Sequence, residues 1–336
     1  MKNTPIKFKP DALTGRLGEE DAKRYFSRFG WFAFAVFVVH LVVANAVVLG
    51  LYKFAPNVYE LPLVRELLSF VPLYCIALPL TYPILRPLHT VRPSKEKMSF
   101  PHFLCSICIC FALMTVGNYI SNFFITFFQM LRGDQIENPL NESLGSSPLW
   151  SIILFTVVLA PLLEELFFRG IVCKKLLCLG EGYAVVLSSA FFALFHGNFY
   201  QLFYAFTLGC FFSFIYVKTG KLKYTVVLHM LINFMGGAVP SILLKYLDVE
   251  QLLEANVEYI TQNIIPVALY VAYAFGIYVL TIGGIIVIST QFRKFRLDSG
   301  ILPPPEKKRA SCVLLNSGVA AAIAAFTLVL ISSLTY

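Results

Sequence analysis

The chain has 336 residues, of which 58% are apolar and 14% are charged. Soluble globular domains are about 45–50% apolar and about 25% charged, so this composition excludes an ordinary soluble protein. Apolar runs of about 20 residues, the length that spans a bilayer as a helix, recur along the sequence. The sequence therefore predicts an all-α fold, a polytopic transmembrane helical bundle.

The apolar runs predict about eight to nine membrane spans. The polar stretch 1–28 lacks the short apolar core and small-residue cleavage site of a signal peptide, so we expect the first span to be retained. Residues 197–201 leave almost no loop between the fifth and sixth spans, which predicts a tight hairpin or a partly re-entrant element. In the last span, Gly318, Ala322 and Ala325 fall on or near one face and predict close packing on another helix. The predicted spans are residues 29–52, 67–88, 101–131, 148–172, 183–199, 200–217, 224–246, 263–291 and 311–334.

The net charge of +8 indicates membrane topology, because the basic residues are unevenly distributed. Five segments carry 23 of the 27 Lys and Arg residues and alternate with segments that carry few. These basic segments are residues 1–28, 86–97, 169–175, 218–223 and 293–309. Basic residues collect on the cytoplasmic side of membrane proteins, which predicts that these segments and the N-terminus are cytoplasmic. The chain shows no basic patch interleaved with aromatic residues, so we expect a lipid bilayer, and no nucleic acid, as its partner.

The eight cysteines are scattered through the predicted spans, so we expect no disulfide framework. Cys105 and Cys108 lie on one helix face with His102 a turn away, which leaves a metal site open as an alternative. Because free cysteine usually behaves as a small apolar residue, we interpret this group as packing residues.

Three apolar segments carry charged or polar side chains that are costly in hydrocarbon, and together they predict a functional site. Glu165 and Arg169 are four residues apart and can pair across one helical turn. Glu164 points about 100° away from Glu165 and is left without this partner. A desolvated carboxylate holds a proton more tightly, which suits a general base that acts near neutrality. For this segment alone, the alternative is a helix end whose Glu-Glu-Arg motif pairs with lipid head groups or with a neighbouring helix.

His196, His229 and Asn233 strengthen the prediction of a site. His229 and Asn233 are four apart on one helix face, as are Phe192 and His196 on another. At about 1.5 Å per residue from the basic helix ends, these side chains and Glu164 lie about 9–20 Å deep. Three helices are therefore expected to bring a carboxylate, two imidazoles and an amide to overlapping depths.

The ordered motifs Glu-Glu-x-x-x-Arg, Phe-x-x-x-His and His-x-x-x-Asn resemble those of the CPBP intramembrane glutamic endopeptidases. This family contains the type II CAAX prenyl endopeptidases and the bacteriocin-processing, Abi-like proteins. The resemblance covers about 148–240, and no motif position departs from the family pattern. The matching residues are Glu164, Glu165, Arg169, Phe192, His196, His229 and Asn233.

The resemblance implies an endopeptidase that acts on a membrane-embedded or lipid-anchored peptide. In the family pattern Glu164, helped by His196, activates a water that attacks the scissile carbonyl. His229 and Asn233 donate hydrogen bonds to the oxyanion, as preorganised donors do in acyl transfer. The resemblance also implies a site that opens toward the cytosolic half of the bilayer. The residues expected to support the site structurally are Glu165, Arg169 and Phe192.

These expectations divide the chain into four regions. Residues 1–28 form a cytoplasmic N-terminal segment, and residues 29–147 form the N-terminal transmembrane helices. Residues 148–246 form the CPBP-like catalytic core, and residues 247–336 form the C-terminal transmembrane helices. We expect a multi-pass protein of the cell membrane, most simply a bacterial plasma membrane.

Two alternatives remain open. A zinc-dependent membrane protease would use Glu164, His196 and His229 as three ligands with one open position, although the motif His-Glu-x-x-His is absent. A non-catalytic bacteriocin immunity factor, another peptide-binding membrane protein or a carrier would use the same polar groups for binding. Carriers often contain internal repeats and broken helices, and neither is evident in this sequence. We predict that the protein needs no cofactor, with zinc left to be tested.

Overall fold

The computed structural model describes every residue except 1–7, 9–10, 12–13, 139–146 and 336. Within this part of the chain the fold is all-helical, with an isolated β-bridge between Gly180 and Ser299. The predicted all-α fold class is confirmed. The longer helices are α1 (Glu19–Phe54), α3 (Pro62–Phe70), α5 (Phe100–Arg132), α10 (Glu181–Phe195), α11 (Phe199–Thr219), α12 (Leu222–Asn233), α16 (Ile264–Gln291) and α18 (Ser317–Ser332). The shorter helices are α2 (Pro56–Tyr59), α4 (Leu78–Thr81), α7 (Leu149–Ser151), α8 (Ala160–Glu164), α9 (Lys174–Leu176), α13 (Val239–Leu243), α14 (Val249–Leu253), α15 (Val257–Gln262) and α17 (Arg309–Leu314).

Seven helices in the described part of the chain are long and apolar enough to cross a membrane. The helix pair Glu306–Leu314 and Ser317–Ser332, bent by 53°, makes an eighth if it acts as one span. The predicted span at 183–199 is α10, whose 15 residues measure about 22 Å and fall short of a hydrocarbon core of about 30 Å. The count therefore agrees with the lower end of the prediction. The seven are Glu19–Phe54, Leu63–Ile84, Phe100–Arg132, Leu149–Leu179, Phe199–Thr219, Leu222–Tyr246 and Ile264–Lys294.

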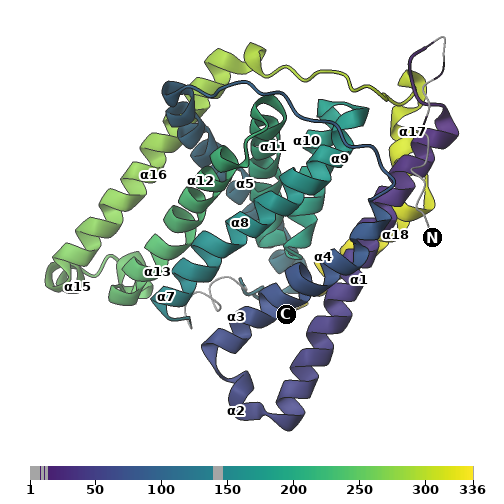
Figure 1. Cartoon of the computed structure of the whole chain (residues 1–336). Coiled ribbons are helices and arrows are strands. Elements are labelled where there is room, and N and C mark those ends of the chain that lie inside the picture. Colours follow the sequence, from purple (N-terminus) through teal and green to yellow (C-terminus); the bar gives the residue numbers. More distant parts are fainter. Residues whose placement is uncertain (1–7, 9–10, 12–13, 139–146, 336) are drawn as a thin grey trace.

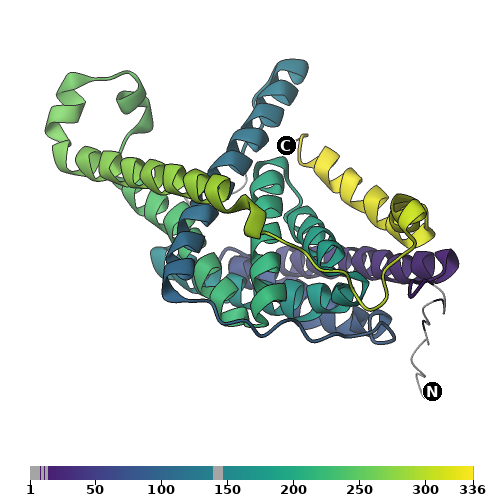
Figure 2. The same cartoon turned by 90° about the horizontal axis from the view of Figure 1, so that it is seen from above.

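The helices pack around a central group formed by α5, α10, α11 and α12. Figures 1 and 2 show α1 and α18 side by side on one flank of the bundle and α16 on the other. A Cβ atom at Gly318 would overlap the carbonyl oxygen of Ser27, and the backbone nitrogen of Gly318 donates to Ser27 Oγ at 3.1 Å. Gly318, Ala322 and Ala325 are all buried. The predicted packing role of these small residues is confirmed.

A tight turn joins α10 to α11. His196 ends α10, and Gly197 follows with a φ of +69°, a conformation that favours glycine. The side chain of Asn198 then caps α11, because its Oδ1 accepts from the backbone nitrogen of Gln201 at 2.9 Å. The predicted tight hairpin is confirmed, and it holds His196 at its tip.

The span that carries Glu164 and Glu165 departs from regular α-helix on both sides of α8. The backbone forms wide, π-type turns over Ile152–Leu159 and Glu165–Cys173. Pro161 has no N–H to donate, and its ring clashes with the preceding turn of a regular α-helix. π-type turns are frequent at functional sites, so the two glutamates lie where the helix is locally irregular.

The basic segments meet on one face of the bundle, which we call the basic face. In Figure 1 this face includes α9, at the end of the span that carries Glu164, and the C-terminal end of α16. Lys218 Nζ lies 2.6 Å from Glu181 Oε2 and 2.9 Å from Asp298 Oδ2, so three chain segments share one ion-pair group. The cytoplasmic orientation of this face stays a prediction. Backbone hydrogen bonds that tie the face together run from Leu17 N to Pro303 O, from Ser94 N to Val217 O, from Glu181 N to Asp298 O and from Leu302 N to Cys178 O.

All eight cysteines are free. His102 Nδ1 lies 2.7 Å from Ser99 Oγ, the residue that caps α5. Among the described residues, no group of three His, Cys, Asp or Glu side chains is placed to hold a metal ion. The alternative of a metal site at Cys105, Cys108 and His102 therefore finds no support in this part of the chain.

Candidate active site

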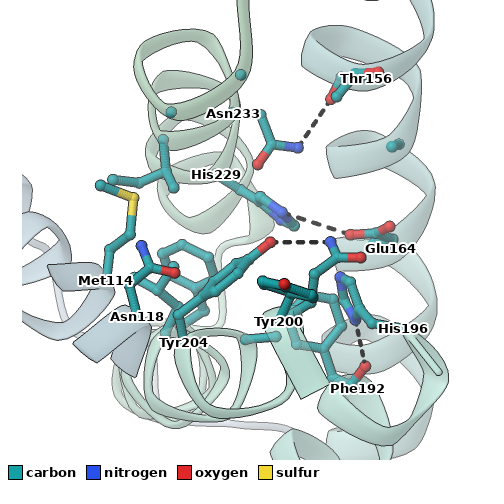
Figure 3. A pocket seen from close by; sticks show the side chains of 18 of the residues that line it. Met114, Asn118, Thr156, Glu164, Phe192, His196, Tyr200, Tyr204, His229 and Asn233 are labelled. Carbon is teal, nitrogen blue, oxygen red and sulfur yellow. Dashed lines mark hydrogen bonds and ion pairs between the residues drawn. The ribbon is translucent and has the colours of Figure 1, made fainter. Parts of the chain in front are cut away.

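A cavity of about 500 Å³ lies at the centre of the bundle (Figure 3). Five of the seven motif residues line it: Glu164, Phe192, His196, His229 and Asn233. They come from the α8 span, α10 with the turn that follows it, and α12, so the structure brings together the three helices that the sequence grouped. Ligand pockets in proteins are commonly about 300–1,000 Å³, so the cavity is large enough to hold a short stretch of peptide.

Glu165 and Arg169 lie behind the cavity and form a buried ion pair. Neither side chain has any exposed surface, and Arg169 Nη1 lies 3.0 Å from Glu165 Oε1. Arg169 Nη2 also donates to the carbonyl oxygen of Gly209 at 3.2 Å. The guanidinium carbon lies 4.6 Å from the ring centre of Phe192, within cation–π range. Arg169 is therefore fixed by three different elements of the bundle.

His229 connects the buried pair to the cavity. Its Nδ1 lies 3.0 Å from Glu165 Oε1, and its Nε2 lies 3.5 Å from Glu164 Oε2. A carboxylate paired with a guanidinium only accepts hydrogen bonds, so Nδ1 of His229 is the donor to Glu165. Nε2 is left to face Glu164, whose side chain is 18% exposed. The adjacent glutamates thus have different environments, as the 100° angle between them predicts.

His196 is oriented by its own helix. Its Nδ1 lies 2.9 Å from the carbonyl oxygen of Phe192, and since a carbonyl only accepts, Nδ1 is the donor. In the neutral ring Nε2 is then an acceptor. The ring of Phe192 stands perpendicular to His196, with ring centres 4.9 Å apart, and perpendicular to His229, with ring centres 5.8 Å apart. Phe192 therefore sets the separation between the two imidazoles.

Asn233 is held by a carbonyl that the irregular helix leaves free. The backbone nitrogen of Ala160 bonds to Phe155 O, and the residue after it is Pro161, which has no N–H. Thr156 O therefore lacks both of the helical donors nearest to it, and Asn233 Nδ2 donates to it at 2.9 Å. One hydrogen of the Asn233 amide is used in this way, and the second stays available to a ligand.

The sequence interpretation did not include Asn118, Asn122 and Tyr204, which line the same cavity. Tyr204 accepts a hydrogen bond from Gln201 Nε2 at 2.9 Å, so its hydroxyl is positioned by its own helix. Asn118 and Asn122 are polar and four residues apart inside an apolar run, which is the signal that identified His229 and Asn233. Applied to the third predicted span, that signal would have found them.

The described residues contain no preformed group of zinc ligands. No three metal-binding side chains are grouped closely enough to hold an ion in this part of the chain. The Nδ1 atoms of His196 and His229 are engaged by Phe192 O and Glu165, which leaves one nitrogen on each ring. Those nitrogens and Glu164 are the three ligands that the zinc alternative names, so this alternative stays a prediction for the chelation test.

The fold and the cavity define a multi-pass membrane protein with a polar site inside its helical bundle. The family model described as type II CAAX prenyl endopeptidase Rce1-like matches residues 146–235, a stretch that contains all seven motif residues. Over this stretch the chain is similar to the CPBP family of CAAX-type membrane proteases.

One curated relative of this chain is named membrane-embedded CAAX protease MroQ and comes from Staphylococcus aureus (strain USA300). The two are 31% identical over 134 residues, which is 37% of this chain and 52% of the relative. The chain therefore spans about half the length of that protein. No solved structure matches the chain.

Proposed function

We propose that this protein is an intramembrane endopeptidase of the cell membrane that hydrolyses a peptide bond with a glutamate-activated water. One observation carries the proposal: Glu164 faces the cavity beside His229, whereas Glu165 is held away from it by Arg169. A catalytic base must be able to reach its substrate, and of the two acids Glu164 lines the cavity. The proposal needs no serine or cysteine nucleophile.

In the proposed reaction Glu164 takes a proton from a water molecule in the cavity, and the water oxygen attacks the scissile carbonyl carbon. His196 Nε2, an acceptor in the neutral ring, holds the other hydrogen of that water. When the tetrahedral intermediate collapses, the C–N bond breaks and Glu164 returns its proton to the leaving amine. The products are a carboxylic acid and an amine, so all atoms are accounted for.

His229 and Asn233 are proposed to stabilise the oxyanion. Asn233 can donate its second amide hydrogen, and the imidazolium form of His229 can donate Nε2–H. Donors aimed at a developing oxyanion contribute about 10²–10³ in rate each in acyl-transfer enzymes.

The test is comparative peptidomics of cells that carry the intact protein, Glu164→Gln or the matched control Glu258→Gln. Glu258 is an exposed acid of α15, outside the residues that line the cavity. Peptides that appear with the intact protein and the control should disappear with Glu164→Gln, because general base catalysis typically contributes about 10²–10⁴ in rate. Near-normal cleavage by a folded, inserted Glu164→Gln protein would reassign the base.

The same assay separates the remaining alternatives. Purified protein in liposomes should retain activity after exhaustive chelation. Loss of activity that zinc restores would establish the zinc-dependent protease instead. Binding of a peptide that is never cleaved would support the immunity or peptide-binding alternative.

A further inference from the structure

The cavity extends away from the basic face. Along α12, His229 lies seven residues beyond Leu222, about 10 Å from the basic end. Along α5, which also starts at the basic face, Asn118 and Asn122 lie about 27 and 33 Å from Phe100. The polar groups of the proposed reaction thus lie at the inner end of a cavity that continues toward the opposite face of the bundle.

This direction differs from the expectation that the site opens toward the cytosolic half of the bilayer. If the basic face is cytoplasmic, as the distribution of Lys and Arg predicts, the cavity opens toward the other half. Its far end lies near the chain that follows α5, because Tyr200 donates to the carbonyl oxygen of Ile136 at 2.7 Å and Asn138 lines the cavity. Asn122 is both exposed and part of the lining, so the cavity reaches the surface there.

The lining is suited to peptide backbone and poorly suited to a lipid tail. Of the 22 lining residues, 12 are polar, and Glu164 is the only Asp, Glu, Lys or Arg among them. Within the described chain no hydrogen bond engages the carboxamides of Asn118 and Asn122, and Tyr204 uses its hydroxyl as an acceptor. A carboxamide offers one donor and one acceptor edge, which matches the N–H and C=O of a single peptide unit.

We propose that Asn118, Asn122 and Tyr204 form a vestibule, which we call the carboxamide vestibule, and that Gln201 positions the Tyr204 hydroxyl within it. It binds the backbone of an extended polypeptide segment that enters from the face opposite the basic face. Unpaired backbone groups of a peptide within the membrane are costly, and the vestibule supplies their partners. Cleavage of the bound segment rests on the proposed function, whereas the side from which the segment enters is tested separately.

The first test maps access without any need for turnover. Asn122→Cys and Ser94→Cys variants of the full chain are treated with a membrane-impermeant maleimide in intact cells and in inverted vesicles, and peptide mass mapping identifies the labelled residue. The mapping distinguishes the new cysteine from the eight natural ones, so the natural chain is used. We expect Cys at 122 to be labelled at least tenfold more from outside, and Cys at 94 to show the opposite preference. Labelling of both from the same side would overturn the proposal even if the protein is a protease.

The second test measures recognition. Asn118→Leu with Asn122→Leu removes the free carboxamides at similar volume, and the matched control is Asn45→Leu, an exposed residue of α1 outside the cavity lining. For a peptide found by the peptidomic comparison, KM should rise about tenfold with kcat within about threefold, since two hydrogen bonds are lost. Unchanged KM, or a KM lowered by the added apolar surface, would show that the vestibule does not bind peptide backbone. Absence of cleavage by any form would count against the proposed function alone, because the labelling result stands without it.

Discussion

Removal of either partner of the buried Glu165–Arg169 pair should destabilise the protein, whereas neutralising Glu164 should not. Arg169→Met leaves Glu165 buried with only His229 and the hydroxyl of Thr225 beside it. Glu165→Gln leaves a buried guanidinium with the Gly209 carbonyl and two aromatic rings, those of Phe192 and Phe212.

The structure sets the size of the effect. Both side chains are fully buried, so neither stranded charge can reach water without opening the bundle. Breaking a buried pair in this way costs about 3–5 kcal/mol in soluble proteins. The double variant Glu165→Gln with Arg169→Met removes both charges, so its cost should be below the sum of the singles by about 0.5–3 kcal/mol. Glu164→Gln keeps a hydrogen-bonding group of similar shape beside His229 and Tyr74, in a partly exposed position, and should cost about 1 kcal/mol or less.

Equilibrium unfolding of the purified variants in mixed micelles, with increasing denaturing detergent, measures these differences. Glu164→Gln is the matched control, because it makes the same chemical change one residue away. Arg169→Met and Glu165→Gln should unfold at clearly lower detergent fractions than the control. The pair is not coupled as the geometry indicates if the free energy of unfolding of either single variant lies within about 1 kcal/mol of that of Glu164→Gln. The same conclusion follows if the loss of stability in the double variant equals the sum of the losses in the two single variants.

Three further outcomes are expected. His229→Gln should lower kcat by about 10²–10³ with little change in KM in single-substrate kinetics, because the group acts mainly on the oxyanion; a change confined to KM would contradict that role. Fluorophosphonates and thiol alkylators should label no catalytic residue, and replacement of all eight cysteines should leave cleavage largely intact; stoichiometric labelling with loss of activity would rule the mechanism out. Gly318→Val should lower the amount of folded protein in membranes, since a Cβ there overlaps Ser27; abundance equal to that of Ala324→Val, an exposed position of the same helix, would show that the α1–α18 contact is dispensable.

Much of this architecture follows from local pattern. Apolar length predicted the all-helical membrane fold, and the four-residue spacing of His229 with Asn233 and of Phe192 with His196 predicted which side chains share a helix face. These properties are visible in the sequence because each depends on one helix at a time. The catalytic roles themselves stay predictions until turnover is measured.

Other features depend on how helices meet and could not be derived in the same way. The composition of residues 183–199 predicts a membrane span, yet α10 ends at Phe195. Gly197 and Asn198 form a turn there, which composition alone does not distinguish from a continued helix. The bond from Asn233 to Thr156 O arises from the turn before Pro161 and requires knowledge of the neighbouring helix. The direction of the cavity depends on the relative lengths and offsets of several helices, which no single run of residues records.

The contact between α1 and α18 has a consequence for biogenesis. Ser27 Oγ lies 3.3 Å from Ser317 Oγ, and the two residues are 290 positions apart in the chain. A ribosome that has released α1 into the membrane must therefore complete nearly the whole protein before α18, the partner of this face of α1, exists. Until then the face of α1 around Gly30 and Trp31 has to be shielded by lipid or by an insertion factor. Quality control should consequently act late on this protein, after its proposed active site has already assembled.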